Sequence, residues 1–260
     1  MRLFPIYLIA KSVLIEALRR KEIYAIILVS LIFIGAIMSV DFFNLQDLEK
    51  FYREVALRIM SVASAVTVIV LSARQLPREF ENRTIYPLLA KPISRAQFLL
   101  GKLCGVMAAA IISFLLLMSV YVAGVLYLNG SIPVVLFLQY LWLQLVMLLL
   151  LCTLSFWLSM LMNLDAAMTI STLLYAFASL FSSMATTLYE FTDAFGRVVL
   201  IIFNYAVPQL VLFDLSEKAV HADKWPPVDM MTLLGVTLYG FFYTALFFSF
   251  TLLTFRRKAL

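Results

Sequence analysis

Long apolar runs separated by short charged segments dominate the chain. A helix needs about 20 mainly apolar residues to cross roughly 30 Å of membrane hydrocarbon, and it satisfies its backbone polar groups internally. The chain, residues 1–260, is therefore predicted to form a single all-α, polytopic transmembrane domain with six spanning helices. The predicted spans are residues 23–40, 55–76, 103–128, 133–162, 166–188 and 230–255.

Residues 1–22 have a different pattern from the spans. Apolar residues recur there at helical spacing, while Lys11, Glu16 and Arg20 lie on the opposite side. Such a pattern predicts an amphipathic helix that lies in the membrane interface. A helix that binds a partner in solution is the alternative.

Residues 189–229 form a predicted outer region before the last span. Its apolar part, residues 198–213, is short and is interrupted by Asn204 and Pro208. This part is predicted to form re-entrant or surface helices rather than a full crossing. The acidic remainder is a candidate lid or a docking site for an outer accessory protein.

Composition excludes a soluble globule. The chain is 64% apolar and 13% charged, whereas soluble domains are about 45–50% apolar and about 25% charged. If the N-terminus is cytoplasmic, most of the 20 lysines and arginines fall in cytoplasmic segments, as the positive-inside rule requires. Both termini are therefore predicted to be cytoplasmic, in the inner (plasma) membrane. The net charge of +5 then indicates topology and some attraction to anionic lipid, not a nucleic-acid partner.

No pattern in the chain indicates catalysis. Gly101-Lys102 is followed by Leu103, without the upstream glycine or the Ser/Thr of a phosphate-binding loop. His221 has no second imidazole or thiol near it in the sequence that would complete a metal site. The chain is therefore predicted not to be an enzyme and to bind no cofactor or metal. Both cysteines lie in apolar runs and are predicted to be small buried hydrophobes.

The segment between the second and third spans, residues 77–102, is the most informative. Pro77 is predicted to start a short helix, with Glu79 and Glu81 near its positive end. Ser94 is predicted to cap the helix that follows. The resulting cytoplasmic segment holds acids and aromatic residues that a solvated basic loop does not require, so we expect it to dock a partner.

This segment also resembles a known family. The resemblance rests on Arg-Glu-Phe-Glu-Asn-Arg-Thr at 78–84, Leu-Leu-Ala-Lys-Pro-Ile-Ser-Arg at 88–95 and Phe-Leu-Leu-Gly-Lys-Leu at 98–103. These motifs are similar to the cytoplasmic signature of ABC-2-type exporter permeases, above all to the branch of the nitrous-oxide-reductase maturation permease. The six-span plan, the interface helix and the basic C-terminal end match as well. Arg83 stands where relatives often have glycine.

The resemblance implies a permease subunit of an ATP-driven exporter. Such a subunit pairs with a second permease copy and with two separate ABC ATPase subunits, which would bind ATP and Mg. Residues 78–90 would then be the coupling helix that transmits the nucleotide state. The residues that this implies for ATPase coupling are Arg78, Glu79, Phe80, Glu81, Arg83, Thr84, Tyr86, Pro92 and Arg95.

Small and hydroxylated residues in the spans permit close helix approach. They suggest a substrate path or a dimer seam, with packing inside one protomer as the alternative. The candidates are Arg58, Ser64, Thr172, Ser179 and Ser183, and Gly101 and Gly105 form a further small-residue pair. Arg58 would either meet an anionic substrate or headgroup, or extend to the membrane surface.

Two other functions stay open at this level. A non-transporting ABC-type membrane anchor, which transmits mechanical work from its ATPase, would share every feature above. A secondary transporter would need ion-coupling groups inside the spans, where only Arg58 at an edge is found. An apolar and hydroxylated path favours a lipid-linked, amphipathic or peptidic cargo over a bare ion.

Overall fold

A computed structural model describes residues 4–39, 48–81, 93–178, 180, 191–193, 195–198, 207–221 and 225–257. All the regular elements in these ranges are helices. They are α1 (Phe4–Leu18), α2 (Lys21–Ser39), α3 (Leu48–Glu81), α5 (Arg95–Tyr127), α6 (Val134–Leu161), α7 (Leu164–Ala176), the 3-10 turn η1 (Leu210–Phe213), α10 (Ser216–Val220) and α11 (Met230–Arg257). The predicted all-α class is confirmed.

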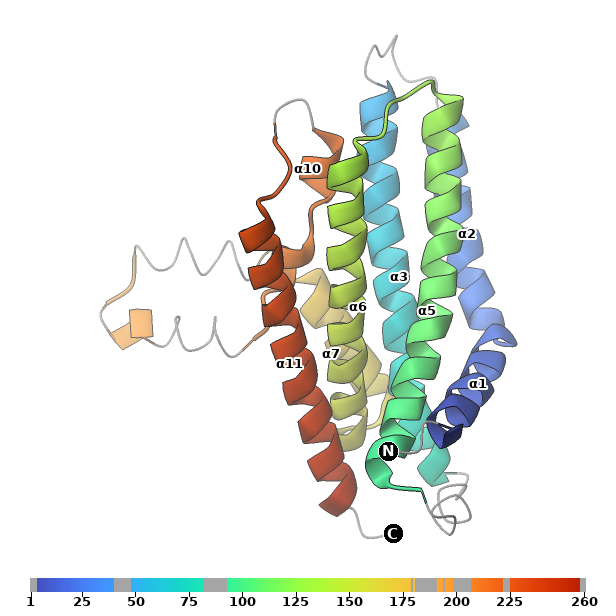
Figure 1. Cartoon of the computed structure of the whole chain (residues 1–260), viewed down its shortest axis with the longest axis vertical. Coiled ribbons are helices and arrows are strands. Elements are labelled where there is room, and N and C mark those ends of the chain that lie inside the picture. The colour runs from blue at the N-terminus through green and yellow to red at the C-terminus, as the bar shows by residue number, and fades with distance from the viewer. Residues whose placement is uncertain are drawn as a thin grey trace.

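Within the described ranges, four helices are long and apolar enough to cross a membrane: α3, α5, α6 and α11. They run side by side along the long axis of the molecule (Figure 1). Shorter apolar helices lie at Tyr24–Ala36, inside α2, and at Leu164–Ala176. The chain is thus a polytopic membrane protein, with a helix at the position of each predicted span. The second half of the predicted span 166–188 lies largely outside the described residues.

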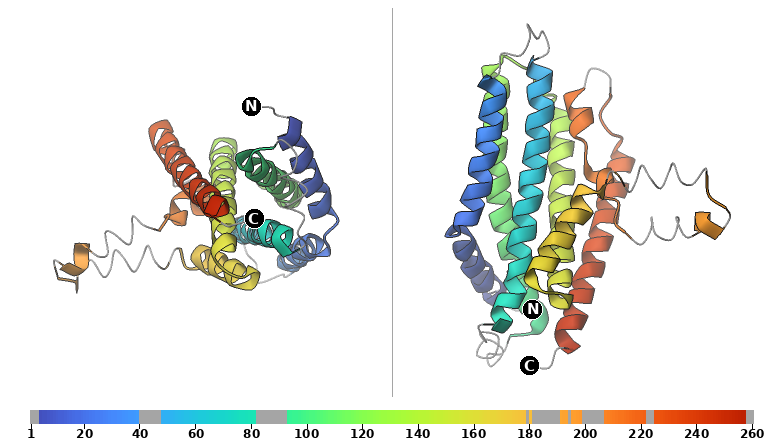
Figure 2. Two further views of the ribbon diagram at one scale, coloured as in Figure 1. Left: turned by 90° about the horizontal axis from the view of Figure 1, so that it is seen from below. Right: turned by 180° about the vertical axis from the view of Figure 1, so that it is seen from behind.

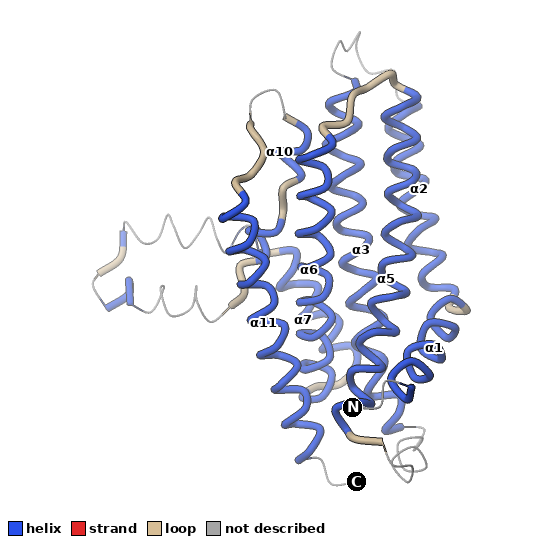
Figure 3. The backbone as a smooth tube through the Cα atoms, viewed as in Figure 1, coloured by secondary structure: helices blue, strands red, loops and turns tan. Residues whose placement is uncertain are grey.

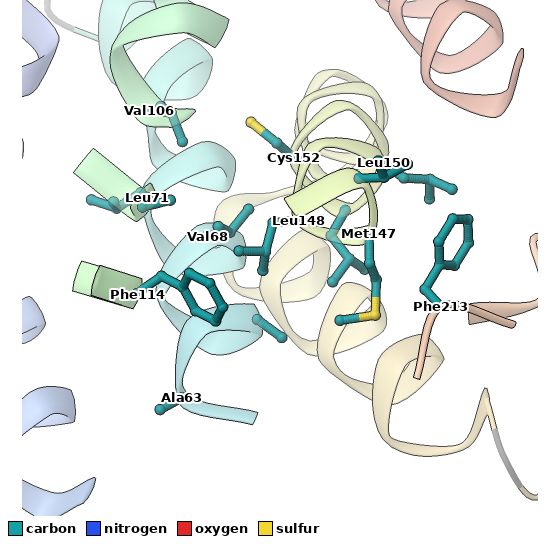
Figure 4. Close-up of a cluster of buried hydrophobic side chains, with 14 of the residues drawn as sticks. Ala63, Val68, Leu71, Val106, Phe114, Met147, Leu148, Leu150, Cys152 and Phe213 are labelled. Atoms are coloured by element: carbon teal, nitrogen blue, oxygen red, sulfur yellow. The ribbon is translucent and has the colours of Figure 1, made fainter. Parts of the chain in front are cut away.

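Helix α3 lies at the centre of the bundle, where it packs against α2, α5, α6 and α7. In its most apolar window 67% of the residues are buried, compared with 22% for α11 at the periphery. Figure 4 shows the core between α3, α5 and α6, with Val68, Phe114 and Leu148 turned toward one another. Cys152 is buried in this core, as predicted, whereas Cys104 is exposed.

Helix α1 crosses the start of α5 obliquely (Figures 1 and 2). Its buried residues Ile9, Val13 and Ala17 recur every four positions, which places them on one face. That face meets the first two glycines of α5: a Cβ on Gly105 would lie 2.6 Å from Cβ of Val13, and one on Gly101 would lie 2.8 Å from Cβ of Ile9. The small-residue pair therefore serves packing inside one chain.

The expectation that Pro77 starts a new helix is wrong. Pro77 lies inside α3, which continues without interruption to Glu81. Proline removes a backbone N–H and disfavours the preceding turn, but the contacts of Glu79 and Phe80 with other helices hold the last turn in place. The two glutamates therefore lie at the carboxyl end of a long helix and not at the amino end of a short one.

The predicted cap of the next helix is confirmed. Ser94 precedes α5, and its hydroxyl accepts a hydrogen bond from the Gln97 amide at 3.2 Å, while the Gln97 side chain accepts from the Ser94 amide at 2.9 Å. This reciprocal capping box satisfies two amides that the helix itself leaves unpaired. It defines where α5 begins.

Between α7 and α11, residues 195–198 are helical, and two further short helices, η1 and α10, precede α11 (Figure 3). The latter two pack on α3 and α6, and Phe213 is fully buried beside Gly240. Of the predicted segment 198–213 the structure describes η1 at its end, and its surface or re-entrant character stays a prediction. Residues 199–206 lie outside the described part.

Candidate functional site

One group of contacts joins the end of α3 to the start of α5, and we call it the α3–α5 junction. Its centre is an ion pair: Nζ of Lys102 lies 2.5 Å from Oε1 of Glu79 and also donates to Gln75 Oε1 at 3.2 Å. The Lys102 and Glu79 side chains are only 6% and 18% exposed. The Lys102 ammonium also lies 5.7 Å from the Phe98 ring. A largely buried, multiply bonded charge fixes the geometry of the two helix ends.

The C-terminal end of α11 completes one side of the junction. The Phe255 ring packs against Phe80 of α3 and Phe98 of α5, with centroid distances of 6.0 and 5.9 Å. The Arg95 guanidinium lies over the Phe255 ring and donates to the carbonyl oxygens of Phe255 and Arg256 at 3.2 and 3.0 Å. A cation at the carboxyl end of a helix is electrostatically favoured.

Helix α1 closes the other side through Glu16. One carboxylate oxygen of Glu16 accepts hydrogen bonds from Arg20 at 2.5 Å and from Arg78 at 2.8 Å. Burial by itself would raise the pKa of Glu16, but the bond and charge of Arg20, with the charges of Lys102 and Arg78, outweigh it and hold the pKa below its ordinary value. Glu16 is thus a carboxylate that links α1 to the last turn of α3.

The residues that the sequence assigned to ATPase coupling fall in three groups. Arg78, Glu79, Phe80 and Arg95 contact other helices within the junction. Glu81 is exposed at the end of α3. Arg83, Thr84, Tyr86 and Pro92 lie outside the described residues.

Sequence reasoning missed Glu16, Lys102 and Phe255 as members of the junction. Lys102 carried a signal, since a lysine in the second turn of an otherwise apolar helix needs a partner. Glu16 carried a weaker one, because Arg20 follows it at the spacing of a helical ion pair. Nothing in the sequence distinguishes Phe255 from the other phenylalanines of the last span.

A second polar cluster lies deep between α3, α6 and α7. The Gln144 side chain is fully buried, and its amide nitrogen donates to the hydroxyls of Ser61 and Ser64, both at 3.2 Å. The Ser61 hydroxyl also lies 3.0 Å from the Tyr175 hydroxyl of α7. Buried polar groups are therefore paired across three helices, which fixes their rotation relative to one another.

Gln144→Leu is expected to lower the free energy of unfolding by about 0.6–1.7 kcal/mol, the range for interhelical hydrogen bonds in membrane proteins. The loss is small because Ser64 keeps its bond to the Ser61 carbonyl. Reversible unfolding in micelles measures it. Ser119→Ala is the control, since this exposed hydroxyl bonds only its own helix, and a Gln144→Leu variant as stable as that control would contradict the prediction.

Beside this cluster lies a cavity of about 430 Å³, which we call the α3–α7 cavity. Arg58 and Thr172, both predicted for a path or seam, line it. Arg58 donates to Asp214 at 2.8 Å, a partner that the sequence did not indicate. Ser64 lies instead inside the bundle, 1% exposed, and Ser179 and Ser183 are outside the described residues. Among the residues described, no group of three His, Cys, Asp or Glu could hold a metal ion.

Comparison with known families identifies the family of this chain. The family model described as ABC-2 family transporter protein matches residues 7–260, which include every helix described above apart from the first turn of α1. A search of the curated proteins returned no match to the chain. The resemblance seen in the motifs is confirmed for the family, and the branch within it stays a prediction. The chain belongs to the ABC-2 transporter family and is a multi-pass membrane permease component of an ABC transporter.

Proposed function

We propose that this chain is the membrane-spanning subunit of an ATP-driven exporter, which dimerises and couples two separate ATPase subunits to the movement of a substrate. Family membership supports the permease part of this assignment. ATP and Mg would bind to the ATPase partners, and the chain itself would not be catalytic. The distribution of basic residues supports a cytoplasmic position for the α3–α5 junction and for both termini.

The observation that carries the proposal is the connectivity of the junction. The segment 82–92 is flanked by the last turn of α3 and the first turn of α5. These helix ends are held to each other by Glu79 and by Lys102 in the second turn of α5, to α1 by Arg78, and to α11 by Phe80 and Arg95. A displacement applied to this segment would therefore reach four helices together, as a rigid-body shift requires.

We infer different roles for the predicted coupling residues that the structure describes. Glu79 and Phe80 are engaged by α5 and α11, so they would relay motion within the chain. Glu81, exposed one turn from Pro77, would contact the ATPase. An ATPase that closes on nucleotide would bind one state of the junction better than the other, and this difference sets the size of the coupling.

Glu81→Lys is expected to reduce the ATPase activity that co-purifies with the full-length chain by about tenfold or more, since reversing an interfacial charge costs several kcal/mol. Membrane insertion and unfolding temperature should not change, because the side chain is exposed. The measurement is ATP hydrolysis in the complex isolated from native membranes through a tag on the permease.

Glu217→Lys is the matched control. It makes the same charge reversal at an exposed glutamate of α10, which packs on α3 and α6 away from the junction. It should leave the co-purifying activity intact. Equal retention of ATPase by Glu81→Lys, Glu217→Lys and the unaltered chain would remove the basis for placing the ATPase at the junction.

A further inference from the structure

Helix α3 separates two hollows that share one wall. On one side, a groove of about 520 Å³ lies between α2 and α3, and we call it the α2–α3 groove. On the other side lies the α3–α7 cavity of about 430 Å³. Arg58, Val62 and Val66 line both. The two hollows are therefore adjacent, with the Arg58 side chain at their boundary.

The two hollows differ in chemistry. Apart from Arg58 and Ser30, the α2–α3 groove is lined by alkyl and aromatic side chains such as Ile26, Val29 and Phe33. Such a surface accepts a hydrocarbon chain and offers no partner to a charged group. It lies on two apolar helices in the part of the chain predicted to span the bilayer, so lipid can enter it laterally.

The α3–α7 cavity carries the polar groups. Hydroxyls of Ser61, Thr172 and Tyr175 line it, together with the Arg58 guanidinium and the Asp214 carboxylate. The two charges are paired at 2.8 Å, and the other Asp214 oxygen accepts from the Ser216 amide at 2.9 Å. The cavity therefore presents one positive and one negative group, with hydroxyls beside them.

The Arg58 side chain stays accessible beside Asp214. It is 65% exposed although it lies within the segment predicted to span the membrane. Arg58 lies near the edge of that span, where an arginine that faces lipid costs less than the about 2.5–3.5 kcal/mol of the bilayer centre. A further polar group brought by a ligand would lower this cost, and the guanidinium has donors left for an oxyanion.

We propose that α2, α3 and α7 form a two-part binding site for a zwitterionic amino-phospholipid. The acyl chain lies in the α2–α3 groove, the phosphate binds Arg58, and the primary ammonium binds Asp214. The charge balance selects this class. An anionic head would leave the Asp214 carboxylate facing a phosphate without a counter-charge. A cationic head would leave the Arg58 guanidinium facing a second positive charge. A choline head has no N–H to donate to the carboxylate.

The proposed site does not depend on the proposed function. Lipid binding can be measured on the chain alone, whereas the exporter assignment is tested by its ATPase partner. Failure of either test leaves the other standing. The competing occupant of this face is a second copy of the chain, since the sequence also suggested a dimer seam here.

The test uses the full-length chain in nanodiscs of phosphatidylcholine. Each preparation holds the same small fraction of a phosphatidylethanolamine, phosphatidylcholine or phosphatidylglycerol probe with a photoactivatable acyl chain. After irradiation, labelled peptides are counted by mass spectrometry. We expect the ethanolamine probe to label residues 25–33 and 59–66 about tenfold more than the other two, the gain from one charge-assisted pair. Equal labelling by all three would show ordinary boundary lipid and overturn the proposal.

Two variants test the two charges separately. Arg58→Gln should lower labelling by the ethanolamine probe to the level of the choline probe. Asp214→Asn keeps an acceptor for the Ser216 amide and should transfer the preference to the phosphatidylglycerol probe. Lys50→Gln removes a positive charge from the same helix outside both hollows and should change nothing.

Asp214→Asn is also a sufficient test by itself. If Arg58→Gln does not fold, the change in lipid preference expected of Asp214→Asn decides the matter alone, and an unchanged preference there overturns the proposal. Disulfide cross-linking between two copies through Val62→Cys, with no labelling of the groove, would show that a second chain covers this face and would equally overturn it.

Discussion

The Lys102→Met variant is expected to lose about 3–5 kcal/mol of its free energy of unfolding, because removing one partner of a buried ion pair leaves the other without compensation. Lys102 is 6% exposed at its side chain and lies 2.5 Å from Glu79. Its ammonium also donates a hydrogen bond to Gln75 and lies over the Phe98 ring. Reversible unfolding of the full chain in micelles measures the loss.

A double variant separates the contribution of the ion pair to stability from that of the volume its side chains fill. Lys102→Met with Glu79→Leu should recover most of the lost stability, since replacing both members of a buried pair by apolar groups is often close to neutral. The non-additivity of this cycle reports the pairwise interaction. Lys21→Met is the control, because that lysine is exposed. If Lys102→Met were as stable as this control, the junction would not be held by its ion pair.

Gly105→Leu is expected to force α1 away from α5. A Cβ at this position would lie 2.6 Å from Cβ of Val13 and 2.8 Å from the Ala10 carbonyl oxygen, and backbone atoms cannot move aside without moving the helix. Overpacking of this kind costs about 1–3 kcal/mol or more. Limited trypsin digestion measures the result. Cleavage at Lys11 inside α1 should become faster by the ratio that corresponds to this loss of free energy, because local opening of α1 exposes the site.

Gly235→Leu provides the matched control for this substitution. Gly235 lies in α11 with no described atom within 4 Å of an added Cβ, so leucine there should be tolerated and should favour the helix. Digestion at Lys11 should then proceed as in the unaltered chain. Equal cleavage rates for Gly105→Leu and Gly235→Leu would mean that α1 does not depend on the close approach at Gly105.

Several features were predictable because they depend on local sequence. A run of apolar residues long enough to cross a bilayer forms a helix whatever its neighbours are, which is why a helix occurs at each expected position. The capping box of Ser94 and Gln97 is likewise a four-residue signal. The family signature was readable for the same reason, since it consists of short contiguous motifs.

Other features depend on which helices meet. Pro77 is a reasonable helix start by local rules, yet it lies within α3 because distant residues hold the turn that follows it. Gly101 and Gly105 were compatible with a seam between two copies, but their partner is α1 of the same chain. Local helix propensity is worth less than about 1 kcal/mol for most residues and about 3 kcal/mol for proline, and tertiary packing can override it.

By itself the sequence determined that this chain is a helical membrane protein, where its helices lie and to which family its motifs point, since hydrophobic length and short motifs are properties of contiguous residues. Only the tertiary structure decided which charges meet. Lys102 and Glu79 are 23 positions apart, and Arg58 and Asp214 are 156 apart. The packing of α3 against its neighbours brings these groups within hydrogen-bonding distance, and no periodicity along the chain encodes that proximity.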